Sequence, residues 1–219
     1  MSILFTLVTF LLFIAVTYLR STRRQAEQPL VFAPPPPPKM VRDAGLEIPD
    51  GYAFHPGHTW VLPEDRQQAR IGLDSFGANL LGTAERVEVP GLNRWIRQGQ
   101  KVMKVTGGGV TVDLVAPVEG VVTAINEKVL MDPSLITKDP YREGWVLMVQ
   151  SPDLAINVKN LLRGSIVRSW MRTALERVSN LTVGYAPAFA QDDGLPIAGL
   201  LGTLDHEVQR EMIREFFLE

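Results

Sequence analysis

The chain has 219 residues, with 22 Lys and Arg against 24 Asp and Glu, and a net charge of −2. This length allows one ordinary domain with appendages, or two small domains. The charge excludes a generally basic nucleic-acid-binding protein, so we expect no nucleic-acid partner. The absence of cysteine excludes disulfide bonds, thiolate metal sites, iron–sulfur clusters and a cysteine nucleophile.

The first 19 residues carry no charged side chain, and only Thr and Tyr are polar in the run 3–19. A helix over this run would be about 26 Å long, close to the ~30 Å hydrocarbon core of a bilayer. A cleaved signal peptide would carry its positive charge before the apolar run and a small-residue cleavage site after it, and this chain has neither. We therefore predict a single-pass membrane anchor with a basic flank over 1–24, made by Ile3, Leu4, Phe5, Leu11, Phe13, Tyr18, Arg20, Arg23 and Arg24.

The arginines of this segment all follow the apolar run. By the positive-inside bias, basic residues next to a span stay on the cytoplasmic side. We therefore expect a bacterial inner-membrane protein with the bulk of its chain in the cytoplasm. Residues 25–50 come next and contain the pentaproline run 34–38, which favours extended polyproline II. We interpret 25–50 as a stiff linker in preference to an SH3-type ligand.

Beyond the linker, short apolar runs alternate with Gly and Pro turn signals, as in a small β domain. This pattern predicts strands at 58–62, 69–73, 84–88, 101–106, 110–116, 120–125 and 144–149. It also predicts a short helix over 73–81 that opens at an Asp or Ser cap, and a longer helix over 152–178 that Gly164 could split. Apolar residues at helical spacing predict a terminal helix over 204–218.

Several motifs of this region resemble the glycine cleavage system H protein. The most specific is DPSLITKDPYREGW at 132–145; His58-Thr59-Trp60-Val61 and Ala116-Pro117-Val118-Glu119-Gly120 resemble two further family motifs. The resemblance implies a mainly β fold with helices, the barrel-sandwich hybrid of lipoyl domains. On this basis we place the H-protein-like domain at 51–165 and a helical C-terminal extension at 166–219.

H proteins carry lipoate, and on it an aminomethyl group, on one lysine at a β-hairpin tip. Counted back from Pro117, the resemblance places that position at Gly109, and Asp113 falls on the family's aspartate. The hairpin segment 106–113 contains no lysine, and Lys101 and Lys104 precede it. We therefore predict that the chain has no lipoyl cofactor, and we expect no other cofactor.

Other candidate chemistry is sparse. His55 and His58 form an H-x2-H pair near Asp50, but a metal would need further converging ligands, and His206 is the only other histidine. We expect a structural histidine beside Trp60 and no metal site. No nucleophile–base arrangement or nucleotide fingerprint is present, so we predict no catalytic residue and no enzyme.

The end of the chain offers candidate partner contacts. The long helix has a mostly basic outer face, which is either a solvated surface or a contact for anionic lipid or an acidic subunit. The apolar C-terminal segment either folds back on the barrel or docks on a partner. The predicted contacts are Arg163, Arg168, Arg172, Tyr185, Phe189, Met212, Phe216 and Phe217.

These observations lead to a hypothesis of function: a non-catalytic accessory subunit, held by one anchor, whose H-like domain docks on a larger membrane complex. The stretch from Tyr18 to Pro29-Leu30 resembles the start of the photosynthetic reaction-centre H subunit, and respiratory or transport complexes stay open as partners. Two alternatives stay open. One is a membrane-tethered lipoyl carrier of one-carbon metabolism that uses Lys104, and the other is a periplasmic efflux adaptor.

Overall fold

The computed structural model describes residues 39–182 and 197–218. The predicted anchor at 1–24, the pentaproline run, Tyr185 and Phe189 lie outside the described residues. Within the described ranges, no helix combines the length and the apolar character that crossing a bilayer requires. The described residues belong to one compact unit.

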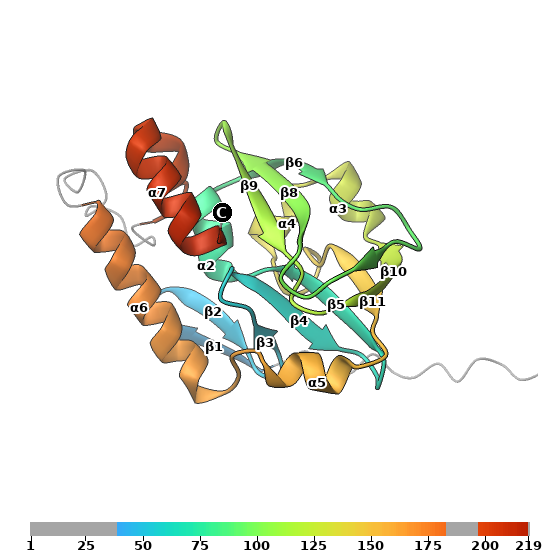
Figure 1. Ribbon diagram of the computed structural model, residues 1–219. Helices are drawn as coiled ribbons and strands as arrows, with labels where there is room; N and C mark the ends of the chain where they lie inside the picture. The colour runs from blue at the N-terminus through green and yellow to red at the C-terminus, as the bar shows by residue number, and fades with distance from the viewer. Residues whose placement is uncertain (1–38, 183–196, 219) are drawn as a thin grey trace, which may run out of the picture. The chain divides into compact units, whose positions relative to one another are not determined.

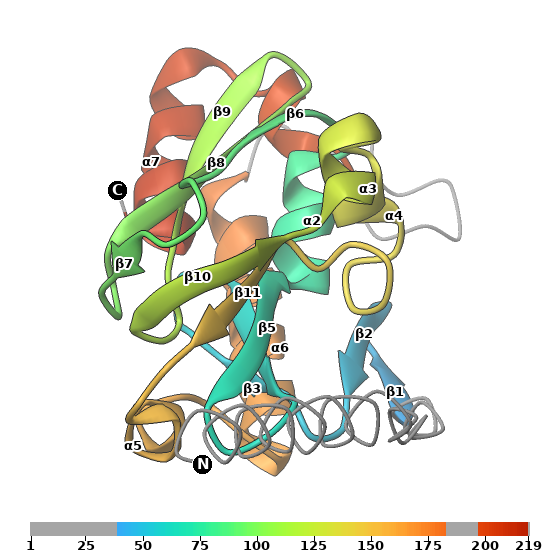
Figure 2. The same cartoon turned by 90° about the vertical axis from the view of Figure 1, so that its right-hand side faces the viewer.

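Two antiparallel sheets form the body of this unit (Figures 1 and 2). The larger sheet has the strand order β3-β4-β5-β11-β10-β7, and the smaller has the order β6-β8-β9. The larger sheet contains β3 (Ala53–Phe54), β4 (Thr59–Pro63), β5 (Gln68–Leu73), β7 (Trp95–Ile96), β10 (Gly120–Ile125) and β11 (Leu147–Gln150). The smaller contains β6 (Ala84–Glu88), β8 (Lys101–Gly107) and β9 (Val110–Val115). All seven predicted strands exist, and the mainly β class with helices is confirmed.

The core follows from the alternation of apolar residues along the strands. In β8 and β9, Met103, Val105, Val112 and Leu114 are buried, while Lys104 is exposed and Asp113 is half-buried between them. A period of two places one set of side chains on the core face of a sheet. The larger sheet supplies Val61, Ile71, Val122 and Val149 to the same core.

A group of aromatic side chains closes one region of the core, and we call Tyr52, Trp60 and Tyr141 the aromatic cluster. The Tyr52 hydroxyl donates to the backbone oxygen of Tyr141 over 2.7 Å, and Trp60 Nε1 donates to the Leu73 oxygen over 2.8 Å. The Ser75 amide donates to the Tyr141 hydroxyl over 2.9 Å. These buried hydrogen bonds tie the segment that contains Tyr141 to the start of the domain.

Helices flank the sheets: α2 (Ser75–Leu81), α3 (Glu127–Met131), α4 (Leu135–Lys138), α5 (Leu154–Lys159), α6 (Ser165–Leu181), the 3₁₀ turn η1 (Leu200–Thr203) and α7 (His206–Phe217). Asp74 caps α2 by accepting from the Gly77 amide, as the sequence predicts, and Asp205 caps α7 in the same manner. The predicted helix 152–178 is divided into α5 and α6 by Gly164, whose φ is +64°. The helices α3 and α4 have no counterpart among the predicted elements.

Part of the predicted linker is a β-hairpin, which corrects the boundary at residue 50. Strands β1 (Met40–Asp43) and β2 (Leu46–Pro49) pair across the turn Ala44–Gly45, and both turn residues have positive φ. Leu46 is fully buried and Ile48 is nearly so. The alternation of Leu46 and Ile48 is that of a half-buried strand, and it was hidden by the composition of the proline-rich residues before it.

Candidate functional site

The β8–β9 hairpin is the part of the fold where the family resemblance places the carrier lysine. Its strands pair in register up to Gly107 and Val110, so Gly108 and Gly109 form a two-residue turn. Their φ angles are +57° and +76°, as a type I′ hairpin turn requires at both positions. The next pair along the strands is Thr106 and Thr111, whose hydroxyls form a 2.8 Å hydrogen bond.

The two turn glycines face different surroundings. A Cβ atom built on Gly109 would meet no atom within 4 Å, so this glycine is the open apex of the hairpin. A Cβ on Gly108 would lie 3.5 Å from the Cα of Gly202. The residue type at the apex is therefore limited by backbone conformation and not by space, and the apex itself offers no amine, thiol or hydroxyl.

The other side of the turn is covered by the chain's own C-terminal residues 197–218, which we call the C-terminal cover. A Cβ on Gly202 would lie 2.8 Å from the Gly108 oxygen, and one on Gly82 would lie 2.8 Å from the Gly199 Cα. The Gly199 amide donates to the Asn79 oxygen over 2.8 Å. Backbones approach this closely only where side chains are absent, so glycines on both sides permit the contact.

The terminal helix α7 completes the cover and lies alongside β9 in Figures 1 and 2. Met212, Phe216 and Phe217 are 0, 3 and 0% exposed. The sequence left two placements open for this helix, and the structure has it folded back on the barrel. We therefore correct the predicted role of these three side chains: the chain itself covers them, and they offer no surface to a partner in this structure.

Two lysines lie on β8 before the turn. Lys104 is opposite Asp113, with its Nζ 3.9 Å from Asp113 Oδ1, and Lys101 Nζ lies 3.8 Å from Asp113 Oδ2. The side chains of Lys104 and Lys101 are 56% and 45% exposed. A shallow hollow of about 280 Å³ beside them is bounded by Glu88, Pro90 and Met103. The hairpin therefore presents amines along its side and none at its apex.

His58, which the sequence predicts to be a structural histidine, is a buried residue that contacts only other parts of the fold. Its Nδ1 lies 2.9 Å from Asp74 Oδ2, and its ring stacks between Phe76 and Trp170 at centroid distances of 4.1 and 4.6 Å. Its backbone has φ +57°. The partners of the histidine are thus not those expected, since Trp170 of α6 provides the stacking surface in place of Trp60.

His55 does not join His58 in a metal site. Its Nδ1 accepts from the Gly57 amide over 3.0 Å, and burial, with a smaller contribution from His58, lowers its pKa. In the ranges 39–182 and 197–218, no group of three or more His, Asp or Glu side chains is arranged to hold a metal ion.

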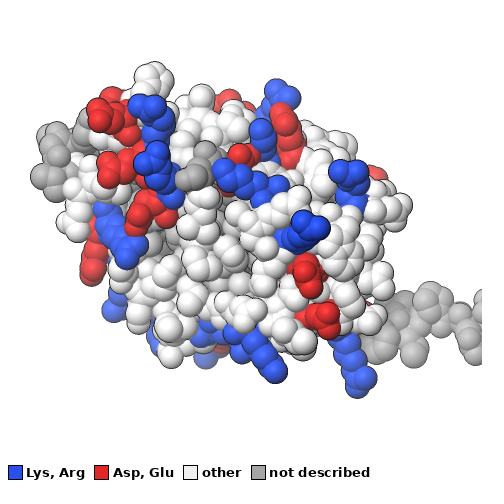
Figure 3. Space-filling view, in the orientation of Figure 1, with Lys and Arg blue, Asp and Glu red and all other residues white. Residues whose placement is uncertain are grey.

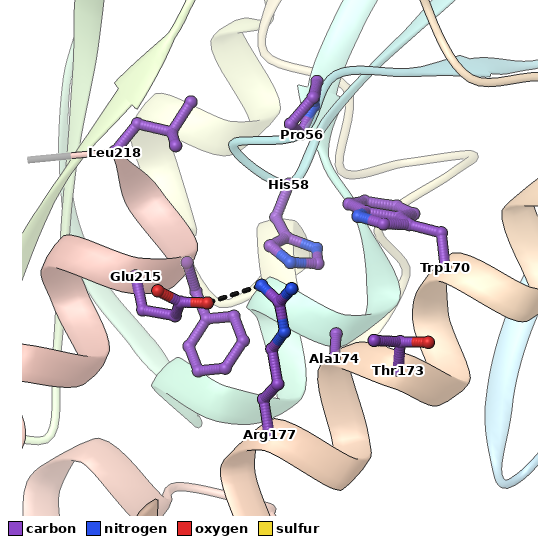
Figure 4. A pocket seen from close by; sticks show the side chains of 9 residues that line it. Pro56, His58, Trp170, Thr173, Ala174, Arg177, Glu215 and Leu218 are labelled. Carbon is purple, nitrogen blue, oxygen red and sulfur yellow. Dashed lines mark hydrogen bonds and ion pairs between the residues drawn. The ribbon is translucent and has the colours of Figure 1, made fainter.

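A cavity of about 320 Å³ lies between α6 and α7 below His58 (Figure 4). Arg177 Nη1 donates to Glu215 Oε1 over 2.5 Å across it, and Thr173, Phe216 and Leu218 line its wall. The two charged side chains that line this cavity, Arg177 and Glu215, pair with each other, and His58 pairs with Asp74. We therefore assign the cavity to the packing of the C-terminal cover.

The basic residues predicted as partner contacts lie on or beside α6. Arg163 and Arg168 are exposed. Arg172 instead donates to Asp43 Oδ1 of β1 over 2.6 Å, so this residue joins the first hairpin to the helix. The contact raises the pKa of Arg172.

Residues that sequence reasoning missed are the glycines of the C-terminal cover, Gly199 and Gly202, and their partners Gly82 and Gly108. Their signal was present as the Gly-x-x-Gly pair at 199–202 in an otherwise apolar stretch. A glycine pair alone does not name its contact, because the partner backbone is about 100 residues away in the chain.

Comparison with known proteins identifies the family of this fold. Residues 52–173, more than half of the chain, match the family described as "Glycine cleavage H-protein". The "Glycine cleavage system H protein" of Legionella pneumophila (strain Corby) is 36% identical over 109 residues, covering 50% of this chain and 86% of the relative. That of Prochlorococcus marinus is 34% identical over 108 residues, covering 49% and 83%.

A solved structure of a glycine cleavage system H protein from Mycobacterium marinum is 28% identical, with a TM-score of 0.48, and covers 54% of this chain and 94% of that one. The matched residues 52–173 include the aromatic cluster and the β8–β9 hairpin, whereas the C-terminal cover lies beyond them. The chain belongs to the glycine cleavage H-protein family.

Proposed function

We propose that this chain is a non-catalytic accessory subunit that uses an H-protein fold for docking and carries no lipoyl arm on its hairpin. The observation that carries the proposal is the Gly108–Gly109 turn, whose Gly108 side lies under the C-terminal cover. Attachment of lipoate through an amide bond needs a primary amine at the attachment point. The apex of this hairpin supplies none.

Exposed apolar side chains support a docking role. Leu92 and Trp95, which precede and begin β7, are 54% and 50% exposed, and Met131 of α3 is 79% exposed. Aromatic residues and methionine are enriched in protein–protein interfaces. The proposal adds the apolar segment 3–19 as a membrane anchor and a membrane complex as partner, with the domain on the cytoplasmic side.

A second candidate function is a carrier role through Lys104, and the names of the relatives favour it. The matched proteins are glycine cleavage system H proteins, and Lys104 is an exposed amine on the same hairpin. A lipoyl group on Lys104 would start from the side of β8, opposite Asp113, and not from the apex. The relatives thus support the carrier class, while the hairpin geometry supports the docking class.

The efflux-adaptor alternative has no support at the hairpin. Adaptors of that kind insert a helical hairpin at this place, whereas two residues join β8 to β9 here.

Mass spectrometry of the intact native chain separates the two candidates. We expect full-length protein from gently solubilised native membranes to have its unmodified mass and to migrate with a larger assembly. A mass increment of one lipoyl group that disappears in Lys104→Arg, and persists in the control Lys101→Arg, would establish the carrier role instead. Release of the unmodified chain as a lone monomer by mild detergent would contradict the docking role.

A further inference from the structure

The corner where α5 meets α6 carries a basic surface with two apolar side chains. Lys159, Arg163 and Arg168 are exposed there, and Ile156 and Ile166 are 59% and 56% exposed. We call these five residues the basic corner. Figure 3 shows Lys and Arg side chains projecting from the lower edge of the molecule, where Figure 1 places α5 and the start of α6.

The sequence concentrates positive charge at this corner. Between residues 154 and 175 there are four basic residues, Lys159, Arg163, Arg168 and Arg172, and no Asp or Glu. Arg172 forms an ion pair with Asp43, whereas the other three form no ion pair within the described residues. The nearest acidic residues along these elements are Asp153 before α5 and Glu176 on α6. Glu119 is also close to α5, because its amide donates to Asn157 Oδ1.

The isoleucines distinguish this corner from an ordinary solvated helix face. The inner side of α6 is already filled, because Val167, Met171, Ala174 and Val178 are buried. Ile156 and Ile166 therefore are additional apolar residues outside the core. Exposed apolar side chains among Lys and Arg suit the headgroup region of a bilayer, where the aliphatic part is buried and the charges meet lipid phosphates.

An anionic bilayer fits this corner better than an acidic protein. Each basic residue close to an anionic membrane surface gains attraction within about one Debye length. The exposed cations of the corner are spread over two helices, from Lys159 at the end of α5 to Arg168 on α6. A bilayer offers a broad anionic surface to cations spread in this way, and the proposed anchor at 3–19 would keep the domain close to it.

We infer that the basic corner rests on the anionic phospholipid surface of the membrane, with Ile156 and Ile166 inserted at the headgroup level. This inference rests on the proposed function, in which residues 3–19 anchor the chain and so keep the corner near that surface. Such docking fixes the orientation of the H-like domain, and it leaves Leu92, Trp95 and Met131 for a protein partner.

The absence of native cysteine allows a direct test, because a single introduced cysteine carries one label. The full-length chain is placed in nanodiscs of phosphatidylcholine alone, or with about one-third phosphatidylglycerol. A polarity-sensitive fluorophore is attached at Ile166→Cys, and in a matched protein at the control site Met131→Cys. We expect a blue shift at residue 166 only in anionic discs, its loss at high salt, and no shift at residue 131.

Charge reversal at the corner tests the cause of the shift. Arg163→Glu with Arg168→Glu should lower the docked fraction about tenfold or more. The control Arg86→Glu with Lys128→Glu makes the same change in net charge away from the corner. The side chain of Arg86 on β6 is 71% exposed, and that of Lys128 on α3 is 65% exposed. This control should leave the shift unchanged.

The outcomes separate the corner from the anchor. Retention in the discs at high salt reports the anchor, and the blue shift reports the corner. A retained chain without the shift, or with an equal shift in neutral discs, overturns the inference and leaves the anchor intact. Loss of the chain from the discs at high salt, after a clear shift at low salt, supports the corner and contradicts the anchor.

Discussion

The aromatic cluster and the hairpin under its C-terminal cover are built on opposite principles. In the aromatic cluster, large side chains fill the core and their polar atoms are matched, as in the 2.7 Å bond from Tyr52 to the Tyr141 oxygen. At the hairpin, backbones meet directly because side chains are missing, as where Gly202 approaches Gly108. The first arrangement stabilises a scaffold, and the second leaves the apex of the hairpin without a functional group.

The two regions also differ in their relation to the family. The aromatic cluster lies wholly within the family match at residues 52–173. The hairpin is inside the match, but it is covered by residues 197–218, which lie outside it. This difference teaches that a segment beyond the family match can pack against a hairpin inside it while the apex residue, Gly109, stays open.

The largest effect is expected from the buried end of α7. Phe217→Ala removes a fully buried ring and should lower the free energy of unfolding by about 3–5 kcal/mol, because it leaves a cavity beneath the cover. Denaturant unfolding measures this change. The control Met131→Ala, at a side chain 79% exposed, should change it by less than about 0.5 kcal/mol. Equal, small effects at both positions would mean that the cover is not part of the core.

The glycine contact should give the next largest effect. Gly202→Ala places a Cβ 2.8 Å from the Gly108 oxygen, and the overlap should cost about 1–3 kcal/mol. Gly91→Ala is the matched control, since its Cβ would meet nothing within 4 Å. We expect the control to be neutral or slightly stabilising. Full stability of Gly202→Ala would show that the cover sits more loosely on the turn than the contact distance indicates.

The sequence predicted the sheets and the main helices well, because their signals are local. Alternation fixes β8 and β9, and Asp74 marks the start of α2. The helices α3 and α4 were missed, since each is no longer than five residues and shows no full helical period. The β1–β2 hairpin was missed because composition outweighed a four-residue alternation.

The candidate site was predictable only in part. The hairpin and the absence of lysine at its apex follow from the sequence and the resemblance. The cover does not, because it depends on contacts between glycines about 100 residues apart, such as Gly108 and Gly202. The partner of His58 was missed for the same reason: Trp170 reaches it only through the packing of α6.

A lysine placed at the apex should make the hairpin an acceptor for a lipoyl group. In Gly109→Lys the new side chain enters open space, while the positive φ should cost about 1–2 kcal/mol. We expect a lipoate-protein ligase to add one lipoyl group to this variant and none to the unchanged chain, as intact mass would show. The control Gly91→Lys should stay unmodified. A folded Gly109→Lys that stays unmodified would mean that the cover, and not only the residue type, blocks the hairpin.

The Tyr52 hydroxyl of the aromatic cluster gives the smallest expected effect. Tyr52→Phe removes the hydrogen bond to the Tyr141 oxygen and should lower the free energy of unfolding by about 1 kcal/mol at neutral pH. Burial raises the pKa of Tyr52 from 10.0 to about 12, against the opposing charge of Arg70. Because the pKa of Tyr52 is higher in the folded than in the unfolded chain, the protonated hydroxyl contributes fully to the free energy of unfolding below pH 10. This contribution is lost as the pH rises toward 12.

Removing the Tyr52 hydroxyl should therefore make the free energy of unfolding fall less steeply between pH 10 and 12 than in the unchanged chain. Denaturant unfolding at several pH values measures the slope, and tyrosinate absorbance follows the ionisation itself. The Tyr141 hydroxyl, whose pKa burial also raises, still ionises in the variant, so part of the slope remains. Parallel curves for the two proteins would show that Tyr52 ionises as freely in the fold as in the unfolded chain, and that the aromatic cluster is less tightly closed than its hydrogen bonds indicate.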